Sequence, residues 1–337
     1  MEKIYKRRML GLCALFAAAI IFAFALGRYP ISPIDIVKIL LSQIFDIHKT
    51  WTDSVETIVL NLRPPRVLAA IIIGAGLSVS GAAYQGMFKN PMVSPDVLGA
   101  SAGAAFGAAL AILLGLGWVA ISASAFVFGI SAVLLAYFIG SVYRGDAVLG
   151  LVLAGIMIST LFSSATSFIK LIADTDSVLP AITYWLMGSL SSIRMADLFP
   201  GTLPIIFGAA VLVALRWQLN VLTAGDDEAK SMGVNTGAIR LAIIICSTLI
   251  TASCVALSGL IGWVGLVIPH FCRMAFGHDN RRVIPASILM GAAYLLFVDT
   301  IARTLTTAEI PIGILTAIVG APVFIYLMLL GGRRHEH

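Results

Sequence analysis

The chain has 337 residues, of which 59% are hydrophobic and only 12% are charged; 22 basic and 17 acidic residues give a net charge of +5. A soluble globular domain has about 25% charged residues and about 45–50% apolar ones. This composition therefore excludes a disordered chain, a nucleic-acid-binding protein and an ordinary cytosolic enzyme, and it requires a lipid bilayer around much of the surface.

Apolar segments long enough to cross a bilayer recur along the whole chain. A transmembrane helix needs about 20 mostly apolar residues. By this measure the sequence predicts an all-α polytopic membrane protein with ten spans, at 9–27, 66–86, 95–115, 118–142, 147–169, 198–217, 238–258, 261–276, 283–302 and 311–331. The span at 261–276 is short and contains Pro269.

The first span follows a basic segment and could instead be a signal peptide. Its apolar run is longer than a usual signal sequence, and FALGRYP, which ends it, lacks a small-x-small cleavage site. Both features favour a retained helix.

Two polar segments, 28–65 and 170–197, interrupt the spans and are expected outside the cytoplasm. Lys and Arg residues concentrate in cytoplasmic segments of membrane proteins. If both termini are cytoplasmic, most of the Lys and Arg residues of this chain fall on the cytoplasmic side. The longest cytoplasmic connection is then 218–237.

The fifth span carries small and hydroxyl side chains at spacings of three and four residues, which places them on one helical face. They are Gly155, Ser159, Ser163, Thr166 and Ser167, with Lys170 beyond them. Such a face either pairs with a neighbouring helix or lines a wet translocation path. Lys170 must reach water or an anion, which slightly favours the path.

The cytoplasmic connection contains GDDEAKSMGVNT, residues 225–236. Acidic residues favour the positive end of a helix dipole, and Gly233 is a typical helix stop. The segment therefore predicts a short helix outside the membrane, either as an ordinary capped loop or as a plug for a groove on a soluble partner.

No residue pattern for bond-making chemistry is present. The sequence contains no P-loop, GxGxxG, HExxH or GxSxG motif, so we predict neither catalytic residues nor a metal site. The cysteines have no CxxC spacing and lie in apolar surroundings, which favours buried free thiols; they are Cys13, Cys246, Cys254 and Cys272. A transporter or channel fits these observations better than a membrane enzyme.

Three long stretches carry a resemblance to a known family. LRPPRVLAAIIIGAGLSVSGAAYQGMFKNPMVSPDVLGASAGA (62–105), GDDEAKSMGVNT and GLIGWVGLVIPHFCRMAFGHDNRRVIPASILMGA (259–292) resemble, in this order, signatures of the FecCD-type permeases. These are the membrane subunits of ABC importers for ferric siderophores, haem and vitamin B12. In overall similarity the chain is nearest to the molybdate/tungstate permeases of this family.

The resemblance implies a single permease domain over 1–337 with ten helices, in which spans 2–5 and 7–10 form an inverted repeat. It implies a homodimer in the bacterial inner membrane, with two ATP-binding cassette subunits and an extracytoplasmic binding protein as partners. ATP and Mg would be bound by the ATPase, with no cofactor on this chain.

The resemblance also assigns site residues. The segment that couples to the ATPase would comprise Gly225, Asp226, Asp227, Glu228, Ala229, Ser231, Met232 and Gly233. Arginines that dock the binding protein would be Arg63, Arg66 and Arg303. For the first two the alternative is snorkelling at a helix start, and for Arg303 a local pair with Asp299. The fifth and tenth spans would line the central path.

The cargo stays open between an oxyanion and a metal chelate, with the oxyanion favoured. Serines of the fifth span suit molybdate without excluding a chelate. A secondary transporter is a remote alternative, because such proteins usually bury charged residues at mid-span. Here the acidic residues nearest the spans lie close to the span ends: Asp96, Asp174, Asp299 and Glu309.

Overall fold

The computed structural model describes residues 2–27, 29, 31–143, 145 and 147–332, and within these ranges the chain forms helices and connections without a strand. The long or apolar helices are α1 (Glu2–Ala25), α4 (Arg63–Met87), α5 (Ala100–Leu113), α6 (Trp118–Val142), α7 (Ala147–Ile172), α9 (Met195–Ala214), α12 (Thr236–Ser258), α13 (Val264–Phe276), α14 (Asn280–Thr304) and α15 (Ile312–Gly332). Short helices lie between them: α2 (Pro33–Ser42), α3 (Asp53–Thr57), the π-helix η1 (Ile58–Leu62), α8 (Val178–Leu186), α10 (Arg216–Ala224) and α11 (Asp226–Ser231).

Each predicted span falls on one of these helices. Seven described helices are long and apolar enough to cross a membrane: α1, the continuous run Asp53–Met87, α6, α7, α9, α12 and α14. The helices α5 and α13 and the segment Ile312–Tyr326 of α15 are also apolar, but they are shorter than these seven. The all-helical membrane fold is confirmed, whereas ten crossings and the inverted repeat stay predictions.

Two helices begin later than predicted. The span at 95–115 becomes helical only at Ala100, because Pro95 has no backbone N–H to donate and Gly99 adopts a left-handed φ of 88°. The span at 261–276 starts at Val264, directly after Trp263, whose φ is 69°. Pro269 nevertheless lies inside α13.

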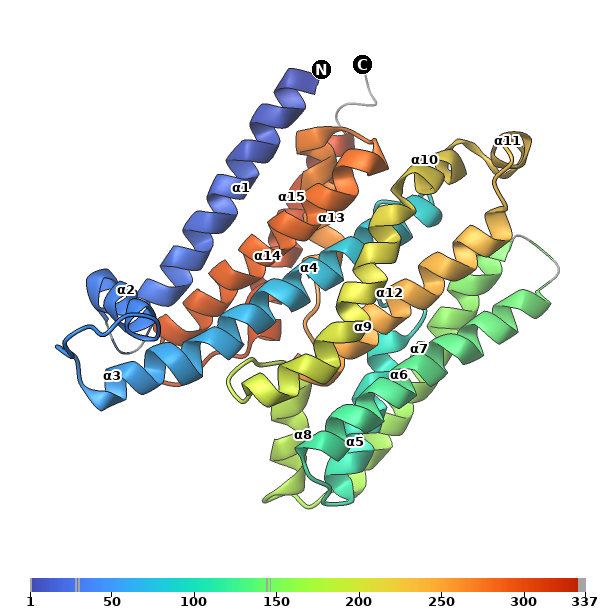
Figure 1. The fold of residues 1–337 in the computed structure, drawn as a ribbon. Coiled ribbons are helices and arrows are strands. Elements are labelled where there is room, and N and C mark those ends of the chain that lie inside the picture. Colours follow the sequence, from blue (N-terminus) through green and yellow to red (C-terminus); the bar gives the residue numbers. More distant parts are fainter. Residues whose placement is uncertain (1, 28, 30, 144, 146, 333–337) are drawn as a thin grey trace.

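The helix α4 lies at the centre of the bundle (Figure 1), between α14 on one side and α9 and α12 on the other. Glycines allow these helices to touch backbone to backbone. A Cβ added to Gly74 would lie 2.3 Å from the carbonyl oxygen of Gly291 on α14, and one added to Gly81 would lie 1.8 Å from that of Gly265 on α13. These glycines thus allow α4 to pack closely against α13 and α14.

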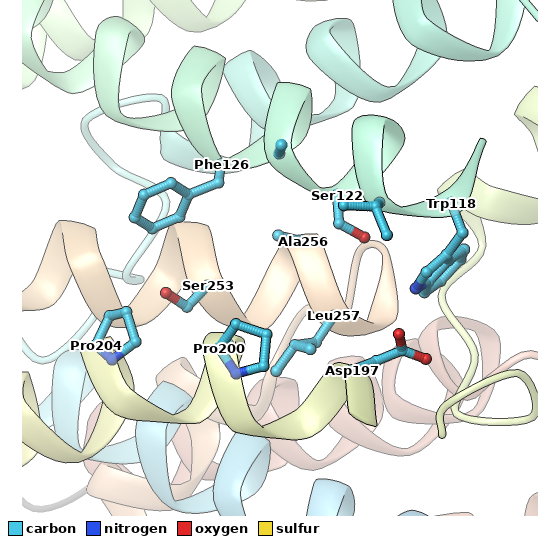
Figure 2. A pocket seen from close by; sticks show the side chains of 12 residues that line it. Trp118, Ser122, Phe126, Asp197, Pro200, Pro204, Ser253, Ala256 and Leu257 are labelled. Carbon is cyan, nitrogen blue, oxygen red and sulfur yellow. The ribbon is translucent and has the colours of Figure 1, made fainter. Parts of the chain in front are cut away.

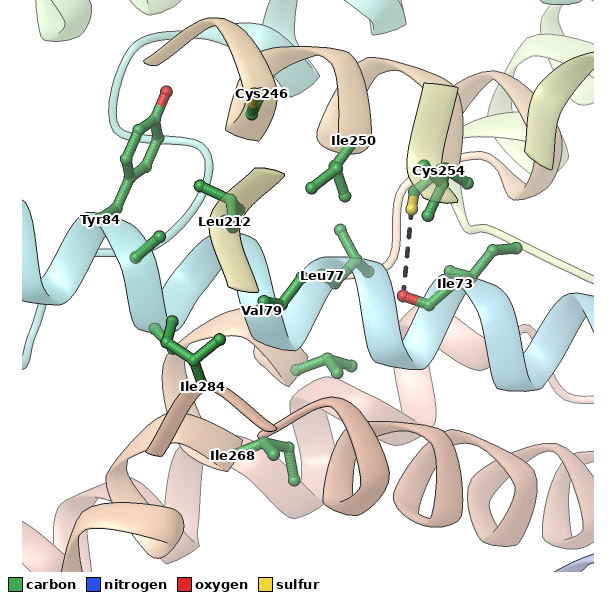
Figure 3. Packing of buried hydrophobic residues seen from close by; sticks show 14 of the residues in the cluster. Ile73, Leu77, Val79, Tyr84, Leu212, Cys246, Ile250, Cys254, Ile268 and Ile284 are labelled. Carbon is green, nitrogen blue, oxygen red and sulfur yellow. Dashed lines mark hydrogen bonds between the residues drawn. The ribbon is translucent and has the colours of Figure 1, made fainter. Parts of the chain in front are cut away.

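Apolar side chains from α4, α9, α12, α13 and α14 fill the space around these contacts (Figure 3). On α12, the Cys254 thiol lies 3.9 Å from the carbonyl oxygen of Ile73 on α4. The cysteines are free, and three are buried as predicted. Cys13 is exposed, which corrects the prediction for that residue: the apolar window of α1 is only 11% buried.

The two ends of the bundle differ (Figure 1). The start of α1, the end of α15 and the helices α10 and α11 lie at one end, and α2, α3 and α8 lie at the other. Side-chain contacts agree, since Arg8 donates to the carbonyl of Ala275 and Arg282 lies 5.3 Å above the ring of Tyr5. The grouping of these elements agrees with the predicted topology, whereas which end faces the cytoplasm stays a prediction. Following that prediction, we refer to the two ends as inner and outer.

The polar segment 28–65 folds at the outer end around a small apolar cluster made of Ile31, Ile36, Ile39 and Val59. Within this segment, Lys49 forms an ion pair with Glu56 at 2.7 Å. The segment is therefore structured, although positions 28 and 30 lie outside the described residues.

Candidate functional site

The predicted coupling segment forms a capped helix, α11. Gly225 precedes it with φ 150° and ψ 161°, a region that is essentially restricted to glycine. The helix ends at Ser231 and is capped by Gly233, whose φ is 77° and whose N–H donates to the carbonyl of Lys230 at 2.9 Å. Val234 N–H donates to the carbonyl of Ala229 at 3.0 Å, which completes a Schellman motif.

The residues of α11 divide into an attached face and an open face. Ala229 is fully buried, and Asp226 accepts a hydrogen bond from Arg240 of α12 at 2.7 Å. The exposed residues are Asp227, Glu228, Lys230, Ser231, Met232 and Gly233. A partner at the inner end would therefore meet two carboxylates and one lysine, while Asp226 and Ala229 hold the helix to the bundle.

The three predicted docking arginines lie at the outer end and are largely buried. Arg63 is 4% exposed and donates to the carbonyls of Phe24 and, at 2.8 Å, Tyr29. These contacts join α4 to the end of α1 and the residues after it. Snorkelling into the interface, the alternative considered for Arg63, does not describe this buried position.

Arg66 and Arg303 share a buried carboxylate. The Asp299 side chain is 0% exposed; it accepts from Arg66 Nε at 2.8 Å and lies 3.5 Å from Arg303 Nε. Arg66 also contacts both carboxylate oxygens of Glu309 at 3.0 Å. The local pair between Arg303 and Asp299, one turn apart, is therefore present.

Arg63, Arg66, Arg303 and Glu309 line a cavity of about 270 Å³ at the outer end. Its apolar lining includes Ile58, Leu62 and Leu190. Two carboxylates face three guanidinium groups here, so the cluster carries one excess positive charge. The arginines thus line a recess and do not form a projecting surface patch.

The small and hydroxyl side chains on one face of α7, which we call the hydroxyl stripe, differ in how deeply they are buried. Gly155 and Thr166 are buried, and a Cβ on Gly155 would lie 2.1 Å from the carbonyl oxygen of Val97. Ser163 and Ser167 are exposed, while Ser159 and Lys170 are partly buried. The buried part of the stripe therefore packs against neighbouring segments, and of the stripe residues only Ser163 and Ser167 are exposed. That these two serines line a path stays a prediction.

A lateral cavity of about 250 Å³ was not predicted from the sequence. It lies between α6, α9 and α12 (Figure 2), with Trp118 and Asp197 near one end and Phe126 and Pro204 near the other. In the sequence, only Pro200, Gly201 and Pro204 distinguish this part of α9 from an ordinary apolar helix. The cavity lies on the opposite side of α6 from α7 and does not extend the hydroxyl stripe.

Sequence reasoning also missed polar residues that join the elements, namely Asn220, Arg240 and Asp279. Their contacts depend on how the helices are placed, and no pattern within one segment of the sequence indicates them. Among the described residues, no group of three or more His, Cys, Asp or Glu side chains could hold a metal ion.

Comparison with known proteins decides the family. The FecCD transport family matches residues 15–330. The chain belongs to this family. It is 37% identical over 332 residues to the molybdate import system permease protein MolB of Haemophilus influenzae, covering 97% of this chain and 98% of that protein.

Other FecCD relatives are equally similar in identity. A probable iron chelatin transport system permease of Helicobacter pylori is 38% identical over 282 residues, covering 84% of this chain and 85% of that protein. A solved structure described as an inward-facing conformation of a metal-chelate type ABC transporter matches with a TM-score of 0.84 and 36% identity, over 96% of this chain and 99% of that one.

The FecCD chain is therefore a multi-pass permease subunit of an ABC importer, and such subunits are not catalytic. The family predicted from the sequence is confirmed. The coupling, docking and path roles of individual residues stay predictions.

Proposed function

We propose that this FecCD permease imports molybdate or tungstate. Two copies would form a homodimer around a path lined by α7 and α15. Two ATPase subunits would act on α11, and an extracytoplasmic binding protein would deliver the cargo. The observation that carries the cargo assignment is the pair of exposed hydroxyls, Ser163 and Ser167, on a face of α7 whose one charged residue, Lys170, lies in the last turn of the helix.

A tetrahedral oxyanion needs hydrogen-bond donors along its route but no fixed cation that would hold it. From 147 to 169 the chain has no charged residue, and serine hydroxyls can donate. Ser167 donates to the carbonyl of Ser163 at 3.0 Å, and its hydroxyl would turn to meet a passing anion. The similarity to a molybdate permease over almost the full length of both chains supports the same assignment.

A metal chelate is the second candidate cargo. Relatives named for iron chelatin, cobalamin and hemin transport match with 37–38% identity, and exposed hydroxyls do not repel a chelate. A gradient-driven secondary transporter is no longer an alternative, because the chain belongs to a family of ABC permeases.

The test is uptake by the complete complex in proteoliposomes. The binding protein is loaded in turn with molybdate, tungstate, a ferric siderophore, haem or cobalamin, and ATP-driven uptake and ATP hydrolysis are measured. We expect stimulation by the two oxyanions. Stimulation only by a chelate would refute the proposed cargo and leave the importer assignment intact.

Substitutions on α7 test the path itself. Ser163→Ala with Ser167→Ala removes both donors and is expected to lower oxyanion uptake severalfold. The matched control is Ser131→Ala on α6, where a half-buried serine donates back to the carbonyl of Val127 at 2.8 Å. Equal uptake by both variants would remove the Ser163 and Ser167 hydroxyls from the path.

Docking of the binding protein at Arg63, Arg66 and Arg303 belongs to the same proposal. The recess can receive an acidic side chain, because its walls carry an excess positive charge. Arg63→Glu is expected to weaken binding-protein affinity, and added salt should weaken it further. Arg194→Glu, at an exposed arginine of the same end, is the control; an equal effect would exclude the recess.

A further inference from the structure

The short helix α10 connects the sixth predicted span to α11 and is packed against the inner end of α4. Its buried residues are Leu219, Val221 and Leu222. Leu219 lies directly over Gly86 of α4, where an added Cβ would be 3.0 Å from the Leu219 side chain. The segment that leads into α11 therefore cannot move without pressing on α4.

A side chain of α10 also holds the start of α14. Asn220 Nδ2 donates to Asp279 Oδ1 at 2.5 Å, and Asn220 Oδ1 accepts from the backbone N–H of Asn280 at 2.7 Å. Both halves of one amide are thus used, on two successive residues at the α13–α14 turn. We call these two hydrogen bonds the Asn220 clamp.

Asp279, to which the Asn220 clamp binds, is itself held by further hydrogen bonds. Asp279 is the N-cap of α14 and accepts from the N–H of Arg281 at 2.9 Å. Burial raises the pKa of Asp279, but hydrogen bonds from Arg281 and Asn220 outweigh that effect and leave the pKa below its usual value. The carboxylate is therefore charged at neutral pH and available to the clamp.

From the clamp, α14 runs to the outer end in close contact with α4. The backbones meet at Gly291 and Gly74, and Asp299 lies at the far end beside Arg66. Since packed helices transmit displacement when they move as a unit, a push on the start of α14 reaches the recess that Arg66, Arg303 and Glu309 form.

We propose that Asn220 is a positioning residue, which transmits the displacement of α11 to the α4–α14 pair through its two hydrogen bonds. This inference rests on the proposed coupling role of α11. On its other side α11 is joined to α12 by the Asp226–Arg240 pair, so the clamp is the polar connection of this segment to α14.

The chemistry of the clamp defines a set of variants. Asn220→Leu keeps the size but removes both bonds. Asn220→Asp removes the donor and places a second carboxylate against Asp279. The double variant Asn220→Asp, Asp279→Asn restores a donor and an acceptor with exchanged positions, and asparagine is as good an N-cap as aspartate. Thr223→Val, at an exposed position of the same helix, is the control.

The experiment uses the complete complex, reconstituted with its ATPase and a molybdate-loaded binding protein. We measure subunit co-purification, melting temperature, ATP hydrolysis with and without binding protein, and molybdate moved per ATP. Coupling free energies of the usual size correspond to about 5–150-fold effects. We therefore expect both single Asn220 variants to lose stimulated hydrolysis and uptake by about fivefold or more.

The double variant decides between coupling and mere folding. We expect it to return to within about twofold of wild type, as the Thr223→Val control does throughout. Wild-type coupling in Asn220→Asp would overturn the proposal, and so would an impaired Asn220→Asp that the second substitution fails to rescue. If wild type itself shows no stimulation with any cargo, the proposed function fails instead.

Discussion

Removal of the Asp299 carboxylate is predicted to be among the most destabilising single changes in the bundle. The side chain is completely buried and lies between two guanidinium groups, at 2.8 Å from Arg66 and 3.5 Å from Arg303. Asp299→Ala would leave both cations to share Glu309, whose side chain is 26% exposed. Breaking a buried pair in this way costs about 3–5 kcal/mol, a large part of a typical stability of about 5–15 kcal/mol.

The free energy of unfolding is measured by denaturing-detergent titration in mixed micelles, followed by circular dichroism. Asp299→Asn keeps an oxygen facing Arg66 and separates the loss of charge from the loss of the hydrogen bond. The matched control is Asp227→Ala, which removes an exposed partner of Lys230 at 3.8 Å. Such a pair is worth less than about 1 kcal/mol.

The reasoning depends on the cluster being shielded from water. If Asp299→Ala cost no more than Asp227→Ala, the recess would have to be wet enough to solvate both arginines. That result would contradict both the description of Asp299, Arg66 and Arg303 as an ion network shielded from water and the stability assigned to it.

Three further outcomes follow from the structure. Gly233→Pro removes the donor to Lys230 and is incompatible with a φ of 77°, so binding-protein-stimulated ATP hydrolysis should be lost; unchanged stimulation would exclude α11 as the coupling element. Gly81→Ala should lower the free energy of unfolding by about 1–3 kcal/mol or more through overpacking. Gly262→Ala should leave it unchanged, because no atom lies within 4 Å of a Cβ added there. Both variants are compared by detergent titration, and equal stabilities would contradict the close contact at Gly81. The lowered pKa of Asp279 should stabilise the folded state fully at pH values above 3.8, the ordinary pKa of the group, and this stabilisation should be lost as the pH falls through the lowered pKa. The free energy of unfolding is compared with that of Asp279→Asn, and a loss of the difference between about pH 5 and 8 would contradict this prediction.

The membrane fold could be predicted because hydropathy is a local property. Each apolar window identified a helix, and the errors concern where helices begin. Gly99 and Trp263 adopt positive φ values that stop a helix, and the surrounding contacts decide this rather than composition. Exposure of Cys13 was missed for the same reason, because an apolar sequence does not distinguish a lipid-facing surface from a core.

The site could be predicted only where its signal lies within one segment. The acidic start and glycine end of α11 are a local capping pattern, and both appear in the structure. By contrast, Arg66 and Asp299 are 233 residues apart, and no periodicity brings them together. The Arg303–Asp299 pair could be anticipated because it spans one helical turn. On α7, the residue spacing predicted which helical face each serine occupies. It could not predict that Thr166 on the same face would be buried by neighbouring segments.

The α4–α14 pair connects the two surfaces proposed for the ATPase and the binding protein. At the inner end Leu219 and Asn220 hold these helices to the segment carrying α11; at mid-length Gly74 and Gly291 bring their backbones into contact. At the outer end Arg66 and Asp299 join them again. A protein that docks on the outer recess and an ATPase that grips α11 would therefore load the same two helices from opposite ends. The binding free energies of two coupled sites change reciprocally, so one rigid pair is sufficient for nucleotide on the ATPase to change the affinity for the binding protein and for the docked binding protein to change the affinity for nucleotide.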